Sequence, residues 1–216
     1  MGDVIMLSER REARRRRATA PRRERSRAQF FFDLSCPFTY LVAERVERAF
    51  DDVSWTPACA ATLGRSSLAT DVGSAAVVRR AAEERAAVLR MPLVWPERFP
   101  SEVSAAMRVA TLAGEAGRGA AFVLAATRLA FCGGFDLDDP ETLAEAAAAA
   151  GVVLEDCLQA ARDEGRDGEI ERAGRVLLAA GAVSLPALRV GRALYSGERQ
   201  VGEAMVAARV ARAAAT

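Results

Sequence analysis

Apolar runs of strand length occur near both ends of the chain, and helical patterns rich in alanine lie between them. Residues 28–34 read as a buried strand because three consecutive phenylalanines stand in them without a polar break. A helical pattern follows over residues 40–50, and residues 53–56 form a second short strand that ends at Pro57. This order predicts two parallel strands joined by a right-handed crossover.

The pattern stays helical from about residue 63 to residue 180, interrupted by glycine, proline and aspartate. Strand character returns at residues 187–190 and 193–195, which predict a short hairpin around Gly191 and Arg192. A last helix is expected over residues 201–213. The chain therefore predicts an α/β fold of the order β-α-β, helical segment, α-β-β-α.

Cys36 stands where the first strand runs into the first helix. Pro37 suits the first helical position because its missing N–H needs no partner there, which places Cys36 at the helix cap. A thiolate is stabilised by the free N–H groups and positive end of a helix, so we expect a pKa below that of a free cysteine. A buried, unreactive thiol is the alternative.

The amino-acid composition excludes several catalytic mechanisms and kinds of metal site. The 216 residues include no histidine, which excludes Ser-His-Asp and Cys-His mechanisms within the chain and removes the commonest transition-metal ligand. The four cysteines, Cys36, Cys59, Cys132 and Cys157, contain no C-x-x-C pair. We therefore expect no bound metal or iron–sulfur cluster.

The distribution of charged and apolar residues predicts where in the cell the protein is found. No secretion signal and no apolar run of membrane-spanning length is present, so we expect a cytoplasmic protein with reduced thiols and no membrane contact. Residues 1–29 carry a net charge of +6 and the remainder −5, and we expect this arginine-rich arm to be disordered. It lacks interleaved aromatic residues, which argues against nucleic-acid binding.

Four stretches carry a resemblance to a known family. The first, residues 30–41, is the strand and helix around Cys36; the second, residues 92–108, is rich in proline and arginine. The third is residues 131–151, and the fourth joins Ser184-Leu185-Pro186 to the turn at residues 195–198. In this order they resemble the 2-hydroxychromene-2-carboxylate isomerase and kappa-class glutathione transferase family, a branch of the DsbA-like proteins.

The resemblance spans about residues 28–210 and implies a thioredoxin fold with a large helical insertion. The implied domains are a thioredoxin-like domain of residues 30–62 and 171–216, an inserted helical domain of residues 63–170 and the arm of residues 1–29. It also implies a cis peptide bond before Pro186, which presents the backbone of Leu185 to a bound thiol or disulfide.

The chain departs from the family patterns at several positions. Disulfide oxidoreductases of this fold have a second cysteine where this chain has Thr39, so no local resolving thiol exists. The isomerases and kappa-class transferases have serine where this chain has Cys36. Leu185 and Ala187 replace the usual valine and threonine beside the cis-proline, so ligand contacts there are expected to differ.

The resemblance implies a cis–trans isomerase acting on an α,β-unsaturated carbonyl compound, either small or a carrier-bound acyl chain. A thiolate would add reversibly to the double bond, with Cys36 as the nucleophile or as the contact of a thiol cofactor. Thr39 and Tyr40 are the candidate hydroxyls for the enolate oxygen. Glutathione or another low-molecular-weight thiol is the candidate cofactor, and the family suggests a homodimer.

Two other classes of function stay open. A monothiol oxidoreductase or a glutathione-conjugating enzyme is the second hypothesis, with Cys59 as a distant resolving thiol. A thioredoxin-fold binding protein without turnover is the third, and a neutral, unreactive Cys36 would point to it.

Further residues are candidates for contact with a substrate or cofactor. They are Pro37, Phe38, Trp95, Arg98, Phe99, Leu185, Pro186, Ser196, Gly197 and Glu198. Aromatic residues could line an apolar pocket and arginine could bind a carboxylate, although packing in the core and a solvated surface are the alternatives for such residues. Trp55 and Arg108 are weaker candidates on the same grounds. We expect Asp33 to be structural, and Cys132 and Cys157 to lie in the core.

Overall fold

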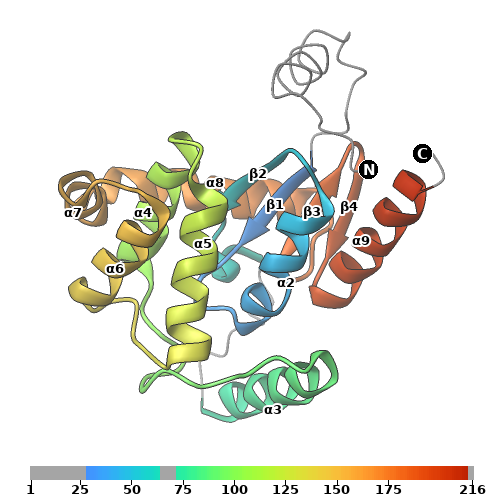
Figure 1. The fold of residues 1–216 in the computed structure, drawn as a ribbon, viewed down its shortest axis with the longest axis horizontal. Coiled ribbons are helices and arrows are strands. Elements are labelled where there is room, and N and C mark those ends of the chain that lie inside the picture. The colour runs from blue at the N-terminus through green and yellow to red at the C-terminus, as the bar shows by residue number, and fades with distance from the viewer. Residues whose placement is uncertain (1–27, 64–71, 214–216) are drawn as a thin grey trace, which may run out of the picture.

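The structure is a computed structural model that describes residues 28–63 and 72–213. Its strands form one mixed sheet in the order β2-β1-β3-β4 (Figure 1). The strands are β1 (Ala28–Phe32), β2 (Val53–Pro57), β3 (Ala187–Val190) and β4 (Ala193–Ser196). β1 pairs in parallel with β2 and antiparallel with β3, and β3 pairs antiparallel with β4, as predicted for a β-α-β unit and a hairpin.

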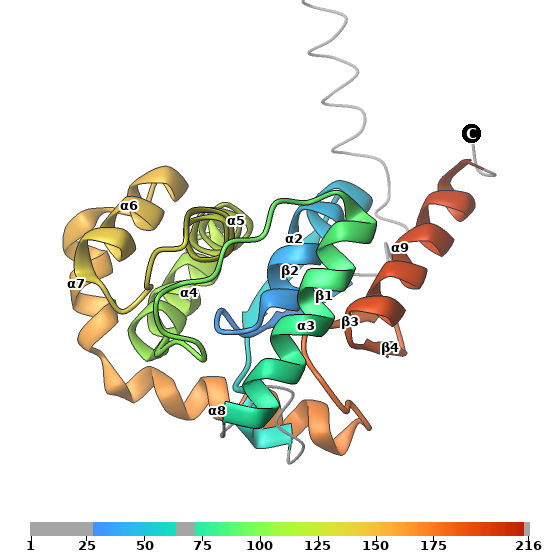
Figure 2. The ribbon, with the colours of Figure 1, turned by 90° about the horizontal axis from the view of Figure 1, so that it is seen from below.

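Most of the described chain between β2 and β3 is helical. The helices are α2 (Pro37–Ala49), α3 (Val72–Leu89), α4 (Ser104–Glu115), α5 (Gly119–Arg128), α6 (Pro140–Ala150), α7 (Leu154–Arg162), α8 (Asp167–Ala179) and α9 (Glu198–Ala213), with short helical turns η1 (Ala60–Leu63), η2 (Leu129–Gly133) and η3 (Glu164–Arg166). Helices α4 to α7 gather at one end of the sheet and α9 lies at the other, while α3 crosses in front of α2 when the molecule is seen from below (Figure 2).

β1 lies in the middle of the sheet between β2 and β3, and its two faces are buried because a different apolar cluster packs against each of them. Side chains of a strand alternate between the two faces. Phe30 and Phe32 belong to the larger apolar cluster, where Phe30 meets Trp55 edge-on at a ring-centroid distance of 4.9 Å. Phe31 belongs to a second cluster. The continuous apolar run in the sequence therefore reflects burial on two sides.

The second apolar cluster surrounds the helix-start cysteine, and we call it the Cys36 cluster. Its members are Phe31, Cys36, Ala58, Ala60, Leu63, Leu177, Ala182, Leu185 and Ala187. They come from β1, the start of α2, the segment after β2 with η1, α8, and the loop before β3 with the first residue of β3. The thiol is thus enclosed by segments that lie far apart in the sequence.

α2 begins as the sequence predicts. Cys36 is the N-cap, with extended backbone angles of φ −88° and ψ 114°, and Pro37 is the first helical residue. Leu41, Val42 and Val46 are buried, so one face of the helix packs into the core. The peptide bond before Pro186 is cis, as the resemblance implies.

Several boundaries differ from the predictions. α9 begins at Glu198, three residues before the expected start, because Gly197 with φ +86° ends the turn after β4. The predicted arm lies outside the described residues except for its last two, which are part of β1. The division into two domains stays a prediction. Among the described residues, no helix has the length and apolar character needed to cross a membrane.

Gly174 lets α8 lie directly against η1. A Cβ added at Gly174 would overlap the hydroxyl of Thr62 and stand 2.9 Å from the carbonyl oxygen of Cys59. We expect Gly174→Ala to lower the free energy of unfolding by about 1 to 3 kcal/mol, the usual cost of overpacking. Gly168→Ala on the same helix is the control, because nothing lies within 4 Å of its added Cβ. Urea denaturation of both variants checks this, and equal losses would contradict it.

Candidate functional site: a groove between α3 and the cis-proline loop

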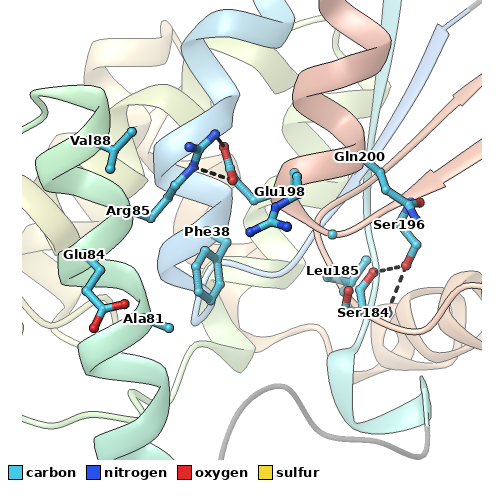
Figure 3. Close-up of a pocket in the computed structure, with 12 residues that line it drawn as sticks. Phe38, Ala81, Glu84, Arg85, Val88, Ser184, Leu185, Ser196, Glu198 and Gln200 are labelled. Carbon is cyan, nitrogen blue, oxygen red and sulfur yellow. Dashed lines mark hydrogen bonds and ion pairs between the residues drawn. The ribbon is translucent and has the colours of Figure 1, made fainter.

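A groove of about 680 Å³ lies between α3, the start of α2, the loop before β3 and the start of α9 (Figure 3). Its lining residues are Phe38, Ala81, Glu84, Arg85, Val88, Ser184, Leu185, Ser196, Gly197, Glu198, Arg199 and Gln200. The volume is in the range of small-molecule and cofactor sites. The structure thus brings together five of the predicted contact residues from three distant segments.

Hydrogen bonds fix the wall of the groove that carries the cis-proline loop. The hydroxyl of Ser196 accepts from the N–H groups of Val183 and Ser184 at 3.0 Å each and donates to the carbonyl of Ser184 at 2.8 Å. The N–H of Gly197 donates to the carbonyl of Pro186 at 2.8 Å. The hydroxyl of Ser196 therefore has partners within the chain and shapes the groove, and its expected role as a polar contact for a cofactor stays a prediction.

Cys36 lies beneath this wall and is completely buried. Its Sγ stands 3.7 Å from the carbonyl oxygen of Leu185, which lines the groove, whereas Cys36 is not among the lining residues. Phe38 lines the groove and also packs against the Cys36 cluster. Leu185 and Phe38 thus stand between the sulfur and the groove.

The prediction of an acidic Cys36 thiol is wrong for this structure. Burial and, secondly, the negative charge of Asp33 raise the pKa of Cys36 to about 12. The N–H groups of Thr39 and Phe38 and the hydroxyl of Thr39 act in the opposite direction and are outweighed. The helix start does favour a thiolate, but a helix end cannot offset the loss of water around a fully buried sulfur.

Asp33 is structural, as predicted. Its carboxylate is buried and accepts hydrogen bonds from the N–H and hydroxyl of Ser35 at 2.9 and 2.6 Å. It also accepts from the N–H of Ala60 at 3.0 Å. Asp33 therefore ties the loop before α2 to the start of η1 and holds the backbone around Cys36 in place.

The two candidate hydroxyls have different positions. Thr39 is fully buried beside Cys36, and its hydroxyl donates to the carbonyl of Asp33 at 2.9 Å. The hydroxyl of Tyr40 instead donates to the carbonyl of Pro92 at 2.9 Å. Burial and, secondly, the neighbouring Cys132 raise the pKa of Tyr40 to about 12. Tyr40 is not a groove residue, so the prediction that it binds an enolate oxygen there is not supported.

The aromatic candidates form a cluster of their own. Trp95 and Phe99 meet edge-on with ring centroids 4.6 Å apart, and the guanidinium of Arg79 stands over both rings. Neither residue lines the groove, although Phe99 packs against the Cys36 cluster. Trp55 is buried in the larger core. The expected aromatic pocket is therefore packing, because these rings find apolar partners within the fold.

The arginines predicted to bind a substrate carboxylate already bind carboxylates of the chain. Arg98 pairs with Asp136 and Asp138 at an exposed position. Arg108 is bound in bidentate fashion by Asp167, with Nε and Nη2 at 2.7 and 2.6 Å from its two carboxylate oxygens. Both therefore join parts of the helical region to each other.

The remaining cysteines have three different environments. Cys157 is buried, as predicted, whereas Cys132 is exposed and not in the core; it lies in the π-helical turn η2 at the end of α5, next to the buried Phe131. Cys59 is half-buried and lines a separate cavity of about 220 Å³ with Asp33 and Met107. It packs against the larger core and not within the Cys36 cluster.

The residues that α3 contributes to the groove were not predicted. They are Ala81, Glu84, Arg85 and Val88. Their spacing of three and four residues marks one helix face, but the sequence does not say which groups that face meets. Glu198 was predicted as a contact residue, but its partners were not. Its carboxylate accepts hydrogen bonds from the guanidinium groups of Arg85 in α3 and Arg45 in α2.

A profile described as a DSBA-like thioredoxin domain matches residues 28–175. The chain belongs to this family. The match begins with β1 and includes Cys36, Thr39 and the helical region up to α8. The resemblance found in the sequence is thereby confirmed at the level of the DsbA-like family and its fold.

Solved structures agree with this assignment. The structure is similar to a 2-hydroxychromene-2-carboxylate isomerase, with a TM-score of 0.72 and 16% identity over 87% of this chain and 97% of the other. It is also similar to a probable DsbA oxidoreductase from Streptomyces coelicolor, with a TM-score of 0.61 and 22% identity over 84% and 89% of the two chains. At such identities the likeness concerns the fold. No curated protein matches the chain.

This DsbA-like chain shows no metal centre in the residues that the structure describes, where no group of three or more cysteine or acidic side chains could hold an ion. The groove offers an open apolar floor at Phe38 and Leu185, backbone groups of the cis-proline loop and charged residues at α3 and α9.

Proposed function

We propose that this protein is a thiol-dependent cis–trans isomerase of an α,β-unsaturated carbonyl compound, with a small thiol such as glutathione held in the groove. The observation that carries this proposal is the position of the groove. It lies along Leu185, whose backbone touches the buried sulfur of Cys36, at the start of α2. A thiol that binds alongside this loop brings its sulfur to the positive end of the helix.

The chemistry needs no histidine. The cofactor thiolate adds to the β-carbon, forming a C–S bond while the π electrons move to the carbonyl oxygen as an enolate. The former double bond is now single and rotates. The enolate then restores the conjugated carbonyl and expels the thiolate, so electrons and atoms balance without an oxidant. We propose that the positive end of α2 stabilises the negative charge of the enolate.

Within this proposal, Cys36 is not the nucleophile: its neutral S–H group donates to the carbonyl of Leu185 and helps to hold the loop that contacts the bound thiol. Its pKa of about 12 keeps it protonated at neutral pH. A neutral thiol is a weak hydrogen-bond donor, and a serine hydroxyl at the same position would be a stronger one. This accounts for a cysteine where the resembling family has serine. A buried, neutral Cys36 favours a bound thiol as the nucleophile over Cys36 itself. It also fits the non-catalytic binding protein, which the test of turnover distinguishes from the isomerase.

The monothiol oxidoreductase receives less support. Thiol–disulfide exchange proceeds through a thiolate, and Cys36 is both buried and protonated. Cys59 packs against a different apolar cluster, which weighs against it as a resolving thiol. A cytoplasmic location and a homodimer stay predictions.

Substitution of Cys36 tests the proposal. A cis-unsaturated keto acid is supplied with and without glutathione, and isomerisation is followed by absorbance. We expect turnover only with glutathione, Cys36→Ser within about twofold of the wild type, and Cys36→Ala slower by about tenfold, because the hydrogen bond to the carbonyl of Leu185 is lost.

The reverse pattern has a distinct meaning. Turnover without any thiol that Cys36→Ser abolishes would make Cys36 the covalent nucleophile. No turnover by the wild type with a range of keto acids and thiols would favour the non-catalytic binding protein. Circular dichroism of both variants controls for folding.

A further inference from the structure

One end of the groove holds two arginines and a single buried carboxylate. Glu198 is buried, with 7% of its side chain exposed. Its Oε1 accepts from Nη2 of Arg45 at 2.8 Å and from Nη2 of Arg85 at 2.9 Å, and its Oε2 accepts from Nε of Arg85 at 2.7 Å. Figure 3 shows Arg85 reaching from α3 to Glu198 across the groove. Two guanidinium groups and one carboxylate leave a net charge of +1 here.

The remaining charges at the groove do not cancel this excess. Glu84 lines the outer part of the groove, but it is largely exposed and lies 4.0 Å from Arg80, which is exposed as well. Arg199 lines the groove and adds a further positive charge. Exposed charges are screened by water and salt, whereas the charges around Glu198 are partly desolvated. The end of the groove around Glu198 therefore carries a net positive charge.

Arg85 is the residue at this end that can meet a ligand. It lines the groove, whereas Arg45 does not. Glu198 engages the Nε and Nη2 edge of its guanidinium, and the other edge at Nη1 has no hydrogen bond to a described residue. The carboxylate of Glu198 already accepts three charged hydrogen bonds, so it is poorly placed to receive the ammonium group of a ligand.

We propose that Arg85, held by Glu198, is the anion-binding residue of the groove and that it recognises a carboxylate of the bound molecule. The inference rests on the proposed function, in which a small thiol and an unsaturated carbonyl compound share this groove. The carboxylate belongs to the thiol cofactor or to the carbonyl substrate. Glu198, expected from the sequence to contact the cofactor directly, acts by orienting Arg85 and excluding a cationic ligand.

Binding of glutathione and of its diethyl ester, which lacks both carboxylates, tests the proposal by titration calorimetry. We expect the wild type to bind glutathione about tenfold or more tightly than the ester. Arg85→Met should lose that difference, because it removes a hydrogen bond between two charged groups. Arg80→Met on the exposed face of α3 is the matched control and should leave the preference unchanged. If the substrate supplies the carboxylate, Arg85→Met instead raises KM for a keto acid but not for its methyl ester.

Glu198→Gln supplies a test that a folding defect cannot imitate. Removing its negative charge leaves both guanidiniums uncompensated, so the carboxylate ligand should bind more tightly, by about threefold or more. Weaker binding of the diethyl ester by Glu198→Gln would show that Glu198 itself holds the ligand through its ammonium group, which the ester keeps, and it would overturn the proposal. An unchanged carboxylate preference in Arg85→Met, for thiol and substrate alike, would also overturn it while leaving the isomerase intact. A wild type that binds no glutathione at millimolar concentration and isomerises nothing would overturn the proposed function, and this inference with it.

Discussion

Iodoacetamide at pH 8 is expected to label Cys36 in the native protein about a thousandfold more slowly than the exposed Cys132. Alkylation needs a thiolate, and the pKa of Cys36 is raised to about 12, whereas a free cysteine has a pKa of about 8.5. The neutral form of Cys36 therefore dominates at pH 8. Complete burial slows the reagent further.

Peptide mapping by mass spectrometry over a pH series measures this prediction. Cys132 serves as the internal control in every sample, and protein unfolded in urea gives the rate of an accessible Cys36. Labelling of native Cys36 as fast as that of Cys132, with a rate that levels off below pH 8.5, would contradict the burial described here. It would also return Cys36 to the part of a covalent nucleophile.

The replacement Asp33→Asn is expected to lower the free energy of unfolding by about 2 to 4 kcal/mol. Both carboxylate oxygens of Asp33 accept hydrogen bonds, two from Ser35 and one from the N–H of Ala60. An amide can accept with one side only, so its NH₂ group would face a buried donor. The negative charge near Cys36 disappears as well, and the pKa of Cys36 should fall while burial still keeps it above that of a free cysteine.

Urea denaturation and the pH dependence of Cys36 labelling check the two parts of this prediction. Asp139→Asn is the matched control, because Asp139 is an exposed N-cap of α6 and asparagine caps a helix about as well as aspartate. We expect a change within about 0.5 kcal/mol for the control. Equal losses of unfolding free energy in the two variants would mean that the buried hydrogen bonds of Asp33 stabilise the fold no more than the exposed ones of Asp139.

Local features of the fold could be predicted because short stretches of sequence determine them. Three consecutive phenylalanines indicate a strand buried on both faces, and β1 has that position. Pro37 starts α2 because a proline ring fits the first turn of a helix. The hairpin of β3 and β4 turns at Gly191, whose φ of +59° glycine adopts without strain.

The environment of each functional group could not be predicted in the same way. A cysteine at a helix start is predicted to have a lowered thiol pKa when only its neighbours in the chain are known. Leu177 from α8 and Leu185 before β3 close around Cys36, and the resulting desolvation reverses the direction of its pKa shift. Charged side chains also gain partners from distant segments: Arg108 meets Asp167, and Glu198 meets two arginines.

By itself, the sequence determined the order of strands and helices and the cap at Cys36, because apolar periodicity, proline and glycine act over a few residues. The cis bond before Pro186 was implied only by the resemblance to a known family. Only the tertiary structure decided that Cys36 is buried and neutral and that α3 forms one wall of the groove. It alone placed Arg85 against Glu198. Desolvation and ion pairing depend on residues that are close in space and far apart in the chain, and no local pattern records them.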